Sequence, residues 1–366
     1  MRLLPLFGAF VNSRQTSDVG CRRSEDEAGD QKSDFRKYNI ADPQLILTAQ
    51  PVRQGYALGM RMDIEQIKRG IESKNSRALA KAISLVEDGA EEADQLLASL
   101  DASRIESSAV IGITGAPGAG KSTLTDKLVA VCRERGKRVG VIAIDPSSPI
   151  SGGAIHGDRI RMMQHALDQD VVVRSMATRG RLGGLCAAAG AASRIMASAG
   201  CDPIIIETVG VGQSEMDIIR IADVTALVSA PGLGDDIQAL KAGLLEVADL
   251  MVVNKADKPG AEMLAMELNE IARAKGRQVM MTVAAQGQGV SELLDAMLEI
   301  FETKRASGQR DQQRAECRNM EVVDWGLEML RPYLYAQSLE QDQKTGGDPR
   351  IRAKEIVDRL FPASTW

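Results

Sequence analysis

Hydrophobic positions in the middle of the chain follow two alternating patterns. Between residues 109 and 282, short apolar runs bounded by glycine and polar residues alternate with stretches of helical spacing. This alternation is typical of a parallel α/β sheet. It predicts seven strands, at 109–114, 138–144, 171–175, 203–208, 224–229, 250–254 and 278–282. Because ligands bind beyond the carboxyl ends of parallel strands, we expect the chemistry in the loops at those ends.

The chain on either side of this region lacks a strand pattern. Residues 1–60 show no sustained period, which predicts a loose extension. Apolar positions then recur at helical spacing, which predicts a helical region over 61–104. A sheet domain over 105–305 and a C-terminal helical arm over 306–366 complete the predicted organisation.

After residue 290, helices are expected near 290–305, 313–340 and 348–361, the last two in the C-terminal arm. The middle helix is polar with an apolar stripe, formed by Val322, Val323, Trp325, Leu327 and Leu330. Such a stripe either makes a dimer contact or wraps the helix around its own domain, and the sequence supports both about equally.

One loop of the sheet domain carries a specific motif. Residues 115–123 read GAPGAGKST and fit G-x-x-x-x-G-K-[ST], between a predicted strand and a predicted helix. Glycines let backbone N–H groups converge on phosphate oxygens, and the helix start adds partial positive charge. Lys121 is expected to neutralise the β- and γ-phosphates, and Ser122 to offer its hydroxyl to Mg²⁺. The predicted nucleotide-binding residues of this phosphate loop are Gly115, Ala116, Pro117, Gly118, Ala119, Gly120, Lys121, Ser122 and Thr123.

Acidic residues follow two other predicted strands. Asp145 ends the second strand, Asp158 lies further along the same loop, and Glu207 ends the fourth strand before a glycine turn of the form [DE]-x-x-G. Mg²⁺ prefers hard oxygen ligands and keeps several waters, so one or two carboxylates suffice. Asp145 and Asp158 also suit the plainer roles of starting a turn and capping a helix. We expect Gly210 to contact the γ-phosphate and Gln213 to orient the attacking water.

The sixth predicted strand runs into the sequence Asn-Lys-Ala-Asp at 254–257. The Asp257 carboxylate can accept hydrogen bonds from N1–H and the 2-amino group of guanine. Adenine offers neither donor, so binding it would leave a carboxylate without its partners. Lys255 is expected to lie across the base, and Asn254 to hold the neighbouring loops together. The pattern therefore predicts selectivity for guanine nucleotides.

Together these segments resemble the MeaB/ArgK family of P-loop GTPases, whose human relative is the methylmalonic aciduria type A protein. The resemblance covers about residues 62–360 and rests on five stretches in this order: GAPGAGKST, IDPSSPISGGAIHGDRIRM, ETVGVGQSE, PGLGDDIQALKAG and VVNKAD. It implies a G domain of the SIMIBI class with helical extensions at both ends, bound GTP or GDP with Mg²⁺, and a homodimer formed through the C-terminal arm.

The resemblance also implies a GTP-dependent chaperone of an adenosylcobalamin-dependent acyl-CoA mutase, typically methylmalonyl-CoA mutase. Cobalamin adenosyltransferase is a further candidate partner. Gln238 and Lys241 lie in a loop that resembles the third switch of the family, which responds to the mutase. The catalytic candidates are thus Lys121, Glu207, Gln213, Gln238 and Lys241. Slow hydrolysis that rises with the partner is expected, because nothing here resembles a committed catalytic base.

Two features depart from the family pattern. The last base-contacting loop usually reads Ser-Ala and here reads Val283-Ala284-Ala285, which removes a hydroxyl but keeps the backbone N–H that contacts guanine O6. The region between Gly260 and Gln278 is also shorter than in many members.

Composition and charge bear on the kinds of partner and on the cellular compartment. The net charge of −5, without a run of basic residues, argues against nucleic acid as a partner. No apolar run approaches 18 residues, which argues against a membrane span. Five scattered cysteines suit a reducing compartment and favour a cytoplasmic protein. Residues 1–24 hold four arginines and one acid, Asp18, so a mitochondrial presequence is the alternative.

Three rival functions remain open. A kinase linked to lysine, arginine and ornithine transport would need a periplasmic acceptor, which does not suit a chain without a credible signal. A nickel-insertion GTPase would carry His-rich tracts or paired cysteines, whereas this chain has only His156 and His165. A non-catalytic nucleotide-dependent scaffold would be excluded by measurable hydrolysis.

Overall fold

The computed structural model describes residues 63–145, 168–177, 184–208, 214–233, 243–341 and 348–361. All of these ranges belong to one structural unit, Leu58–Trp366. The predicted extension over 1–60 lies outside the described residues.

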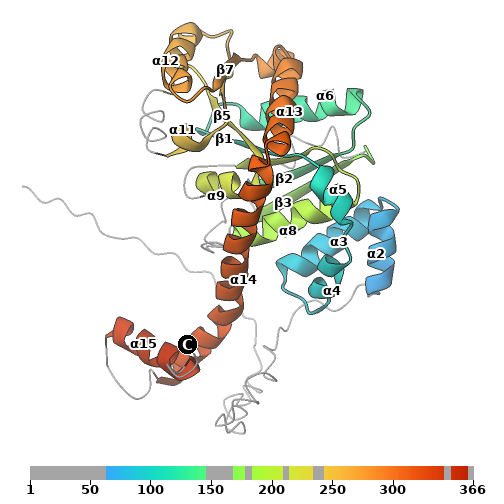
Figure 1. Ribbon diagram of the computed structural model, residues 1–366, viewed down its shortest axis with the longest axis vertical. Helices are drawn as coiled ribbons and strands as arrows, with labels where there is room; N and C mark the ends of the chain where they lie inside the picture. Colours follow the sequence, from blue (N-terminus) through green and yellow to red (C-terminus); the bar gives the residue numbers. More distant parts are fainter. Residues whose placement is uncertain are drawn as a thin grey trace, which may run out of the picture. The chain divides into compact units, whose positions relative to one another are not determined.

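A single parallel sheet forms the centre of this unit (Figure 1). Its strand order is β3-β2-β4-β1-β5-β6-β7, and every neighbouring pair is parallel. All seven predicted strands are present, each within two residues of its predicted ends. They are β1 (Val110–Gly115), β2 (Val139–Asp145), β3 (Val171–Ala177), β4 (Ile204–Thr208), β5 (Val224–Ser229), β6 (Leu250–Val253) and β7 (Gln278–Met281).

Helices cover both faces of the sheet because strand side chains alternate between them. Helices α6 (Lys121–Glu134) and α13 (Val290–Ala306) share a buried core with Ile111 and Ile113 of β1. The other face is covered by α8 (Gly184–Ser198), α9 (Ser214–Ile221), α11 (Leu244–Val247) and α12 (Ala261–Arg273). The result is a three-layer α/β/α fold, as the alternating pattern predicts.

Helix α9 lies directly against β1 at Gly112. A Cβ atom at this position would lie 2.4 Å from Cγ2 of Ile218 and 2.9 Å from Cβ of Ala222. Both distances are too short for any side chain. Glycine therefore allows α9 to approach the strand that leads into the phosphate loop.

Four short helices precede the sheet: α2 (Ile64–Glu72), α3 (Ser76–Glu87), α4 (Glu92–Ala98) and α5 (Ala102–Ser107). Asn75 caps α3, since its side-chain oxygen accepts hydrogen bonds from the N–H groups of Arg77 and Ala78, each at 3.0 Å. Buried Ile67, Leu79 and Leu96 join the core that includes α8. The region is helical as predicted, although α5 is an addition.

Two helices follow α13: α14 (Gln309–Gln341) and α15 (Pro349–Leu360). The apolar stripe of α14 is divided between two faces. Trp325 packs against the core of its own domain, whereas Val322, Val323 and Leu327 are 71%, 60% and 54% exposed. Part of α14 therefore wraps its own domain, and part of its apolar surface remains uncovered. Within the described ranges, no helix is both long and apolar enough to cross a bilayer.

Candidate nucleotide-binding site

The phosphate loop joins the end of β1 to the start of α6. Gly115, Gly118 and Gly120 have φ angles of +137°, +78° and +90°, which favour glycine. A Cβ at Gly115 would lie 2.0 Å from the carbonyl oxygen of Val228, and one at Gly120 would lie 2.5 Å from Nδ2 of Asn254. A Cβ at Gly118 would meet nothing within 4 Å. The loop is thus fixed by close contacts on the protein side and open beside Gly118.

Lys121 is held inside the loop. Its side chain is 6% exposed, and its ammonium group donates hydrogen bonds to the carbonyl oxygens of Gly115 at 2.6 Å and Ala116 at 3.1 Å. A buried ammonium group requires such oxygen partners. Phosphate oxygens of a bound nucleotide are partners of the same chemical kind, so this position suits the predicted role of Lys121.

Ser122 and Glu207 meet at the carboxyl edge of the sheet. Glu207 ends a strand that pairs with β1, with Ile113 and Glu207 in register. The Ser122 hydroxyl donates a hydrogen bond to Oε1 of Glu207 at 2.5 Å, and Glu207 is 1% exposed. A hydroxyl and a carboxylate are hard oxygen donors, so this pair fits Mg²⁺. Among the described residues, three or more acidic, His or Cys side chains do not gather into a metal cluster.

The side chains of six other predicted site residues lie outside the described part of the structure. The backbone of Asp145 ends β2, beside β4, but its side chain lies outside the described part of the structure. Asp158, Gly210, Gln213, Gln238 and Lys241 also lie outside the described ranges. Their predicted roles stay predictions.

Asn254 connects three loops at this edge. Its Nδ2 donates a hydrogen bond to the carbonyl oxygen of Ala119 at 2.9 Å. Its Oδ1 accepts hydrogen bonds from the Thr282 hydroxyl at 3.1 Å and from the Ala284 N–H at 3.0 Å. Asn254 is 2% exposed, so every one of these bonds replaces contacts with water. The geometry agrees with the expectation that Asn254 holds the loops together.

Thr282 is a member of this network that the sequence motifs did not predict. This threonine follows β7 and is 1% exposed. The signal for its role is its position directly before Val283 and Ala284, but a threonine at the end of a strand is common in any sheet.

The remaining base-contacting candidates lie nearby. Lys255 has a φ angle of +57°, and its ammonium group donates a hydrogen bond to the Gly118 carbonyl oxygen at 2.7 Å. Asp257 is exposed and forms an ion pair with Lys258 at 3.5 Å. Ala284 begins the short helix η3 (Ala284–Gln286), which follows Val283, and Ala285 is exposed. The structure thus brings the phosphate loop and the predicted guanine loops to one edge.

Two of the cysteines that the structure describes are unsuited to nucleophilic chemistry. Burial raises the pKa of the Cys132 thiol, on α6, to about 11, and it raises the pKa of Cys201 to about 11 as well. Both thiols are protonated at neutral pH and do not act as nucleophiles there.

The profile of the family described as methylmalonyl Co-A mutase-associated GTPase MeaB matches residues 79–338. The chain belongs to this family. Membership of the MeaB/ArgK family makes the protein a P-loop GTPase, and its α/β domain is built on the seven-stranded parallel sheet.

Three relatives illustrate the range of this MeaB family. A protein of Pyrococcus abyssi named as a GTPase is 47% identical over 69% of this chain and 79% of its own length. GTPase ArgK of Escherichia coli is 36% identical over 59% of this chain and 67% of its own length. The methylmalonic aciduria type A homolog of Mus musculus, a mitochondrial protein, is 36% identical over 54% of this chain and 50% of its own length.

The fold also has a counterpart among solved structures. The crystal structure of LAO/AO transport system kinase superimposes with a TM-score of 0.60, covering 83% of this chain and 99% of that one. The two chains are 23% identical, so this likeness supports the fold alone.

Proposed function

We propose that this MeaB-family GTPase acts as a GTP-dependent chaperone of an adenosylcobalamin-dependent acyl-CoA mutase, with methylmalonyl-CoA mutase as the client. Hydrolysis of GTP would gate cofactor loading and would protect or reactivate the mutase. The observation that carries the nucleotide part is the Asn254 network, because it joins the phosphate loop to the loops expected to contact guanine.

In this proposal each end of the nucleotide has its own partners. Lys121 exchanges its carbonyl contacts for β- and γ-phosphate oxygens, and the open side of the loop at Gly118 admits them. Asp257 accepts hydrogen bonds from guanine, with Lys255 beside the base. Ala285 offers its backbone N–H to guanine O6, because the N–H of Ala284 donates to Asn254. The G domain then corresponds to residues 105–305.

We further propose that Ser122 and Glu207 hold Mg²⁺, with Asp145 and Asp158 as additional acids. When bound, the ion would neutralise negative charge on the β- and γ-phosphates. The protein contributes the orientation of the two oxygen groups, which the 2.5 Å contact between Ser122 and Glu207 already brings together.

The client follows from similarity rather than from a binding surface. The matching family is described by its association with methylmalonyl Co-A mutase, and the mouse relative is named for methylmalonic aciduria. Both descriptions refer to a methylmalonyl compound. Cobalamin adenosyltransferase is a second candidate partner in this proposal.

Homodimerisation through the arm over 306–366 also forms part of the proposal. Large apolar side chains on α14 and α15 remain exposed, and a second copy would remove them from water. They include Val322 (71%), Val323 (60%), Met329 (61%) and Ile351 (60%).

The experiment that tests the function is GTP and ATP turnover by the full chain, with and without a purified adenosylcobalamin-dependent methylmalonyl-CoA mutase. We expect slow turnover that is selective for GTP and that rises several-fold with the mutase. The Lys121→Ala variant serves as the control for contaminating activity. GTP turnover that ignores the mutase would contradict the client, and equal ATP turnover would favour the transport-linked kinase alternative.

A further inference from the structure

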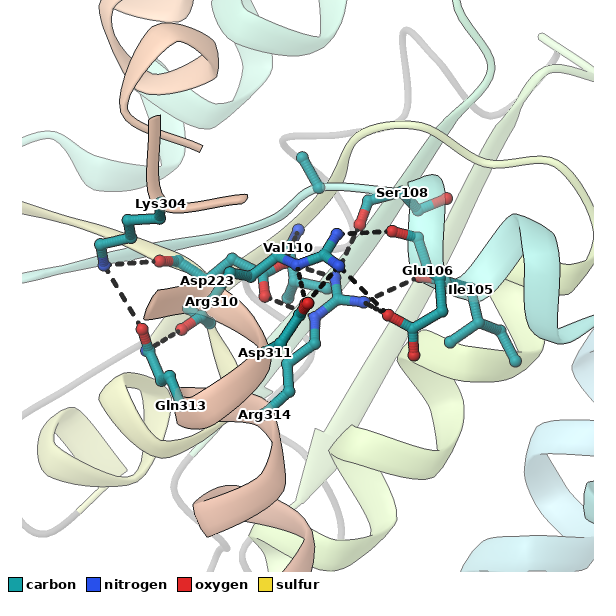
Figure 2. Close-up of polar contacts among 12 residues, drawn as sticks. Ile105, Glu106, Ser108, Val110, Asp223, Lys304, Arg310, Asp311, Gln313 and Arg314 are labelled. Carbon is teal, nitrogen blue, oxygen red and sulfur yellow. Dashed lines mark hydrogen bonds and ion pairs between the residues drawn. The ribbon is translucent and has the colours of Figure 1, made fainter. Parts of the chain in front are cut away.

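The start of α14 is fastened to the sheet at the edge opposite the nucleotide site (Figure 2). We call the residues that make this connection the anchor cluster; they are Glu106, Asp223, Lys304, Arg310, Gln313 and Arg314. Arg314 donates to both carboxylate oxygens of Asp223, each at 2.7 Å. Asp223, 2% exposed, also accepts a hydrogen bond from the N–H of Val110 at 2.9 Å. The anchor cluster therefore fixes α14 to the first residue of β1.

A pocket of about 90 Å³ lies beside the anchor cluster, between α5, α8, α9 and α14. One water molecule needs roughly 10–15 Å³ of such space, so the pocket has room for about six non-hydrogen atoms. One side of its wall is apolar and comes from β1, α8 and the end of α9, with Val110, Ala197, Ile221 and Ala222. The close packing of α9 on Gly112 and the anchor cluster hold these elements in place. The shape of the pocket is therefore fixed by the fold.

The other side of the wall is charged. Among the residues that the structure describes, it holds four arginines and four acids, so net charge does not select a ligand. Two of the acids already accept several hydrogen bonds. The Asp223 carboxylate accepts those of Arg314 and Val110, and Glu321 accepts two from Arg194, at 2.8 and 2.7 Å. These contacts also occupy the guanidinium groups of Arg194 and Arg314.

Arg220 and Arg318, which also line the pocket, keep hydrogen-bonding capacity. Within the described part of the chain, Arg220 donates one hydrogen bond, to Asp324 at 3.3 Å, and its other ion-pair partner, Asp217, is 3.9 Å away. Arg318 reaches Glu106 at 3.9 Å, which is longer than a hydrogen bond. A guanidinium group carries five N–H donors in a planar fork that matches a carboxylate. The hydrogen-bonding capacity that remains in the wall therefore favours an anion.

We propose that this pocket binds a small organic acid of about six non-hydrogen atoms, the size of a four-carbon carboxylate. Its carboxylate lies on Arg220 and Arg318, and its short apolar body lies against Ala197 and Ile221. An inorganic anion would leave the apolar wall without a partner, and a neutral molecule would not use the guanidinium groups.

This inference goes beyond the proposed chaperone function and does not depend on GTP binding, because the pocket lies at the opposite edge of the sheet and shares no residue with the nucleotide site. Helix α14 forms one wall of the pocket, and α8 and α9 form another. A bound acid would thus bridge these helices and stabilise the attachment of α14 to its own domain.

The test uses the full chain with sodium butyrate as the probe and Cys317 as the reporter. Cys317 lines the pocket, and burial raises the pKa of its thiol, so its alkylation by N-ethylmaleimide is followed at mildly alkaline pH by peptide mass spectrometry. Butyrate should slow this alkylation, with a half-maximal effect at about 1 mM, as suits so small a ligand. Butyramide has the same shape without the charge, and inorganic phosphate has charge without an apolar body. At constant ionic strength, each should act about 5-fold more weakly or less.

Thermal unfolding gives a readout that does not involve the thiol. A ligand that binds only the folded chain lowers the unfolding equilibrium constant about 10-fold at about ten times its dissociation constant. The unfolding midpoint should therefore rise with butyrate and not with butyramide.

Two variants change the two sides of the wall. Arg318→Gln should weaken butyrate binding about 5-fold or more, because it removes a charged partner of the carboxylate. Arg331→Gln is the matched control: Arg331 lies on the same helix, its side chain is 56% exposed like that of Arg318, and it pairs with Glu328 outside the pocket. Ala197→Val narrows the apolar side and should weaken butyrate to a similar extent with every arginine kept. Its unfolding curve without butyrate shows whether it folds; if it does not, the two arginine variants decide.

The outcomes separate this proposal from the nucleotide site. Butyrate that neither slows alkylation of Cys317 nor raises the unfolding midpoint would overturn the pocket assignment. Equal effects of butyramide would overturn the role of the guanidinium groups, and equal effects of phosphate would overturn the role of the apolar wall. An equal loss in Arg318→Gln and Arg331→Gln would show a general effect of charge. Lys121→Ala should bind butyrate like the wild type, so a failure of GTP binding leaves the pocket standing, and the reverse also holds.

Discussion

The two edges of the sheet use charge in opposite ways. At the nucleotide edge, the buried ammonium group of Lys121 donates hydrogen bonds to the carbonyl oxygens of Gly115 and Ala116 in the phosphate loop. At the opposite edge, buried charges have charged partners: Lys304 contacts Asp249 at 2.7 Å, and Arg314 contacts Asp223 at 2.7 Å. One edge carries the phosphate loop, and the other ties α14 to the sheet through ion pairs.

Because of this difference, we expect one edge to determine nucleotide affinity and the other to determine stability. A hydrogen bond to a carbonyl oxygen can be exchanged for one to a phosphate oxygen, whereas removing one partner of a buried ion pair leaves the other charge uncompensated. Substitutions at the nucleotide edge should therefore reduce affinity with modest effects on folding. Substitutions of Arg314 and its partners at the opposite edge should reduce stability with modest effects on nucleotide affinity.

The largest expected effect concerns Lys121. Replacement by alanine removes charge-assisted hydrogen bonds to the phosphates, each worth about 1.5–3 kcal/mol, so GTP affinity should fall by about 100-fold or more. Binding of a fluorescent GTP analogue measures the loss. Lys127→Ala is the control, because Lys127 lies on the same helix with a side chain that is 37% exposed. An equal loss in both variants would contradict the assigned role.

The anchor edge is tested by Arg314→Ala. This change leaves the buried Asp223 carboxylate without its guanidinium partner, which should cost roughly 3 kcal/mol of stability. Thermal unfolding should show a clearly lower midpoint, with GTP affinity near that of the wild type in the folded protein. Arg318→Ala is the control, since Arg318 is 56% exposed and lies 3.9 Å from Glu106. Similar unfolding midpoints for the two variants would show that the Arg314–Asp223 ion pair contributes no more stability than the exposed Arg318–Glu106 pair.

A smaller effect is expected for Asp257→Asn. The carboxamide keeps one acceptor but replaces the second with a donor. The affinity for GTP should therefore fall by about 10-fold or more, while the affinity for xanthosine triphosphate should rise. Competition between the two nucleotides measures the change. Loss of both nucleotides, rather than an exchange of preference, would indicate damage to the loop and not a lost guanine contact.

The smallest effect is expected for Val283→Ser. Val283 is 8% exposed, and its N–H donates to the Gln288 carbonyl oxygen at 3.0 Å, a backbone bond that serine retains. Restoring the hydroxyl usual in the family should change the ratio of GTP to ATP affinity by about 3-fold or less, equivalent to one weak hydrogen bond. A change of a hundred-fold would show that this side chain, and not the backbone, dominates recognition of the base.

Sequence patterns predicted the sheet well because its strands are short apolar runs bounded by glycine and polar residues. The phosphate loop and residues 254–257 were found for the same local reason, since each motif is contiguous. Helix α5 was not predicted, because six residues are too few to establish a period. The division of the apolar side chains of α14 between two faces was also not predicted. Helical spacing does not identify which apolar residue, Trp325 or Val322, faces the domain.

Long-range polar contacts were beyond sequence reasoning. Thr282 contacts Asn254, and Arg314 contacts Glu106 and Asp223, through loops and helix ends that only the folded topology brings together. Each residue alone is an ordinary polar side chain. Their roles follow from the strand order, which the apolar pattern does not specify.

That strand order has a consequence for biosynthesis. In β1, Ile111 pairs with Ile205 of β4 and with Val224 of β5, both far along the chain, and Asn254 closes the phosphate loop later still. Such non-local pairing is slow to form. A nascent chain growing from its N-terminus would carry the glycine loop long before it has the neighbours that shape it. GTP can therefore stabilise only a nearly complete chain, and it would act as a ligand of late folding rather than as an early template.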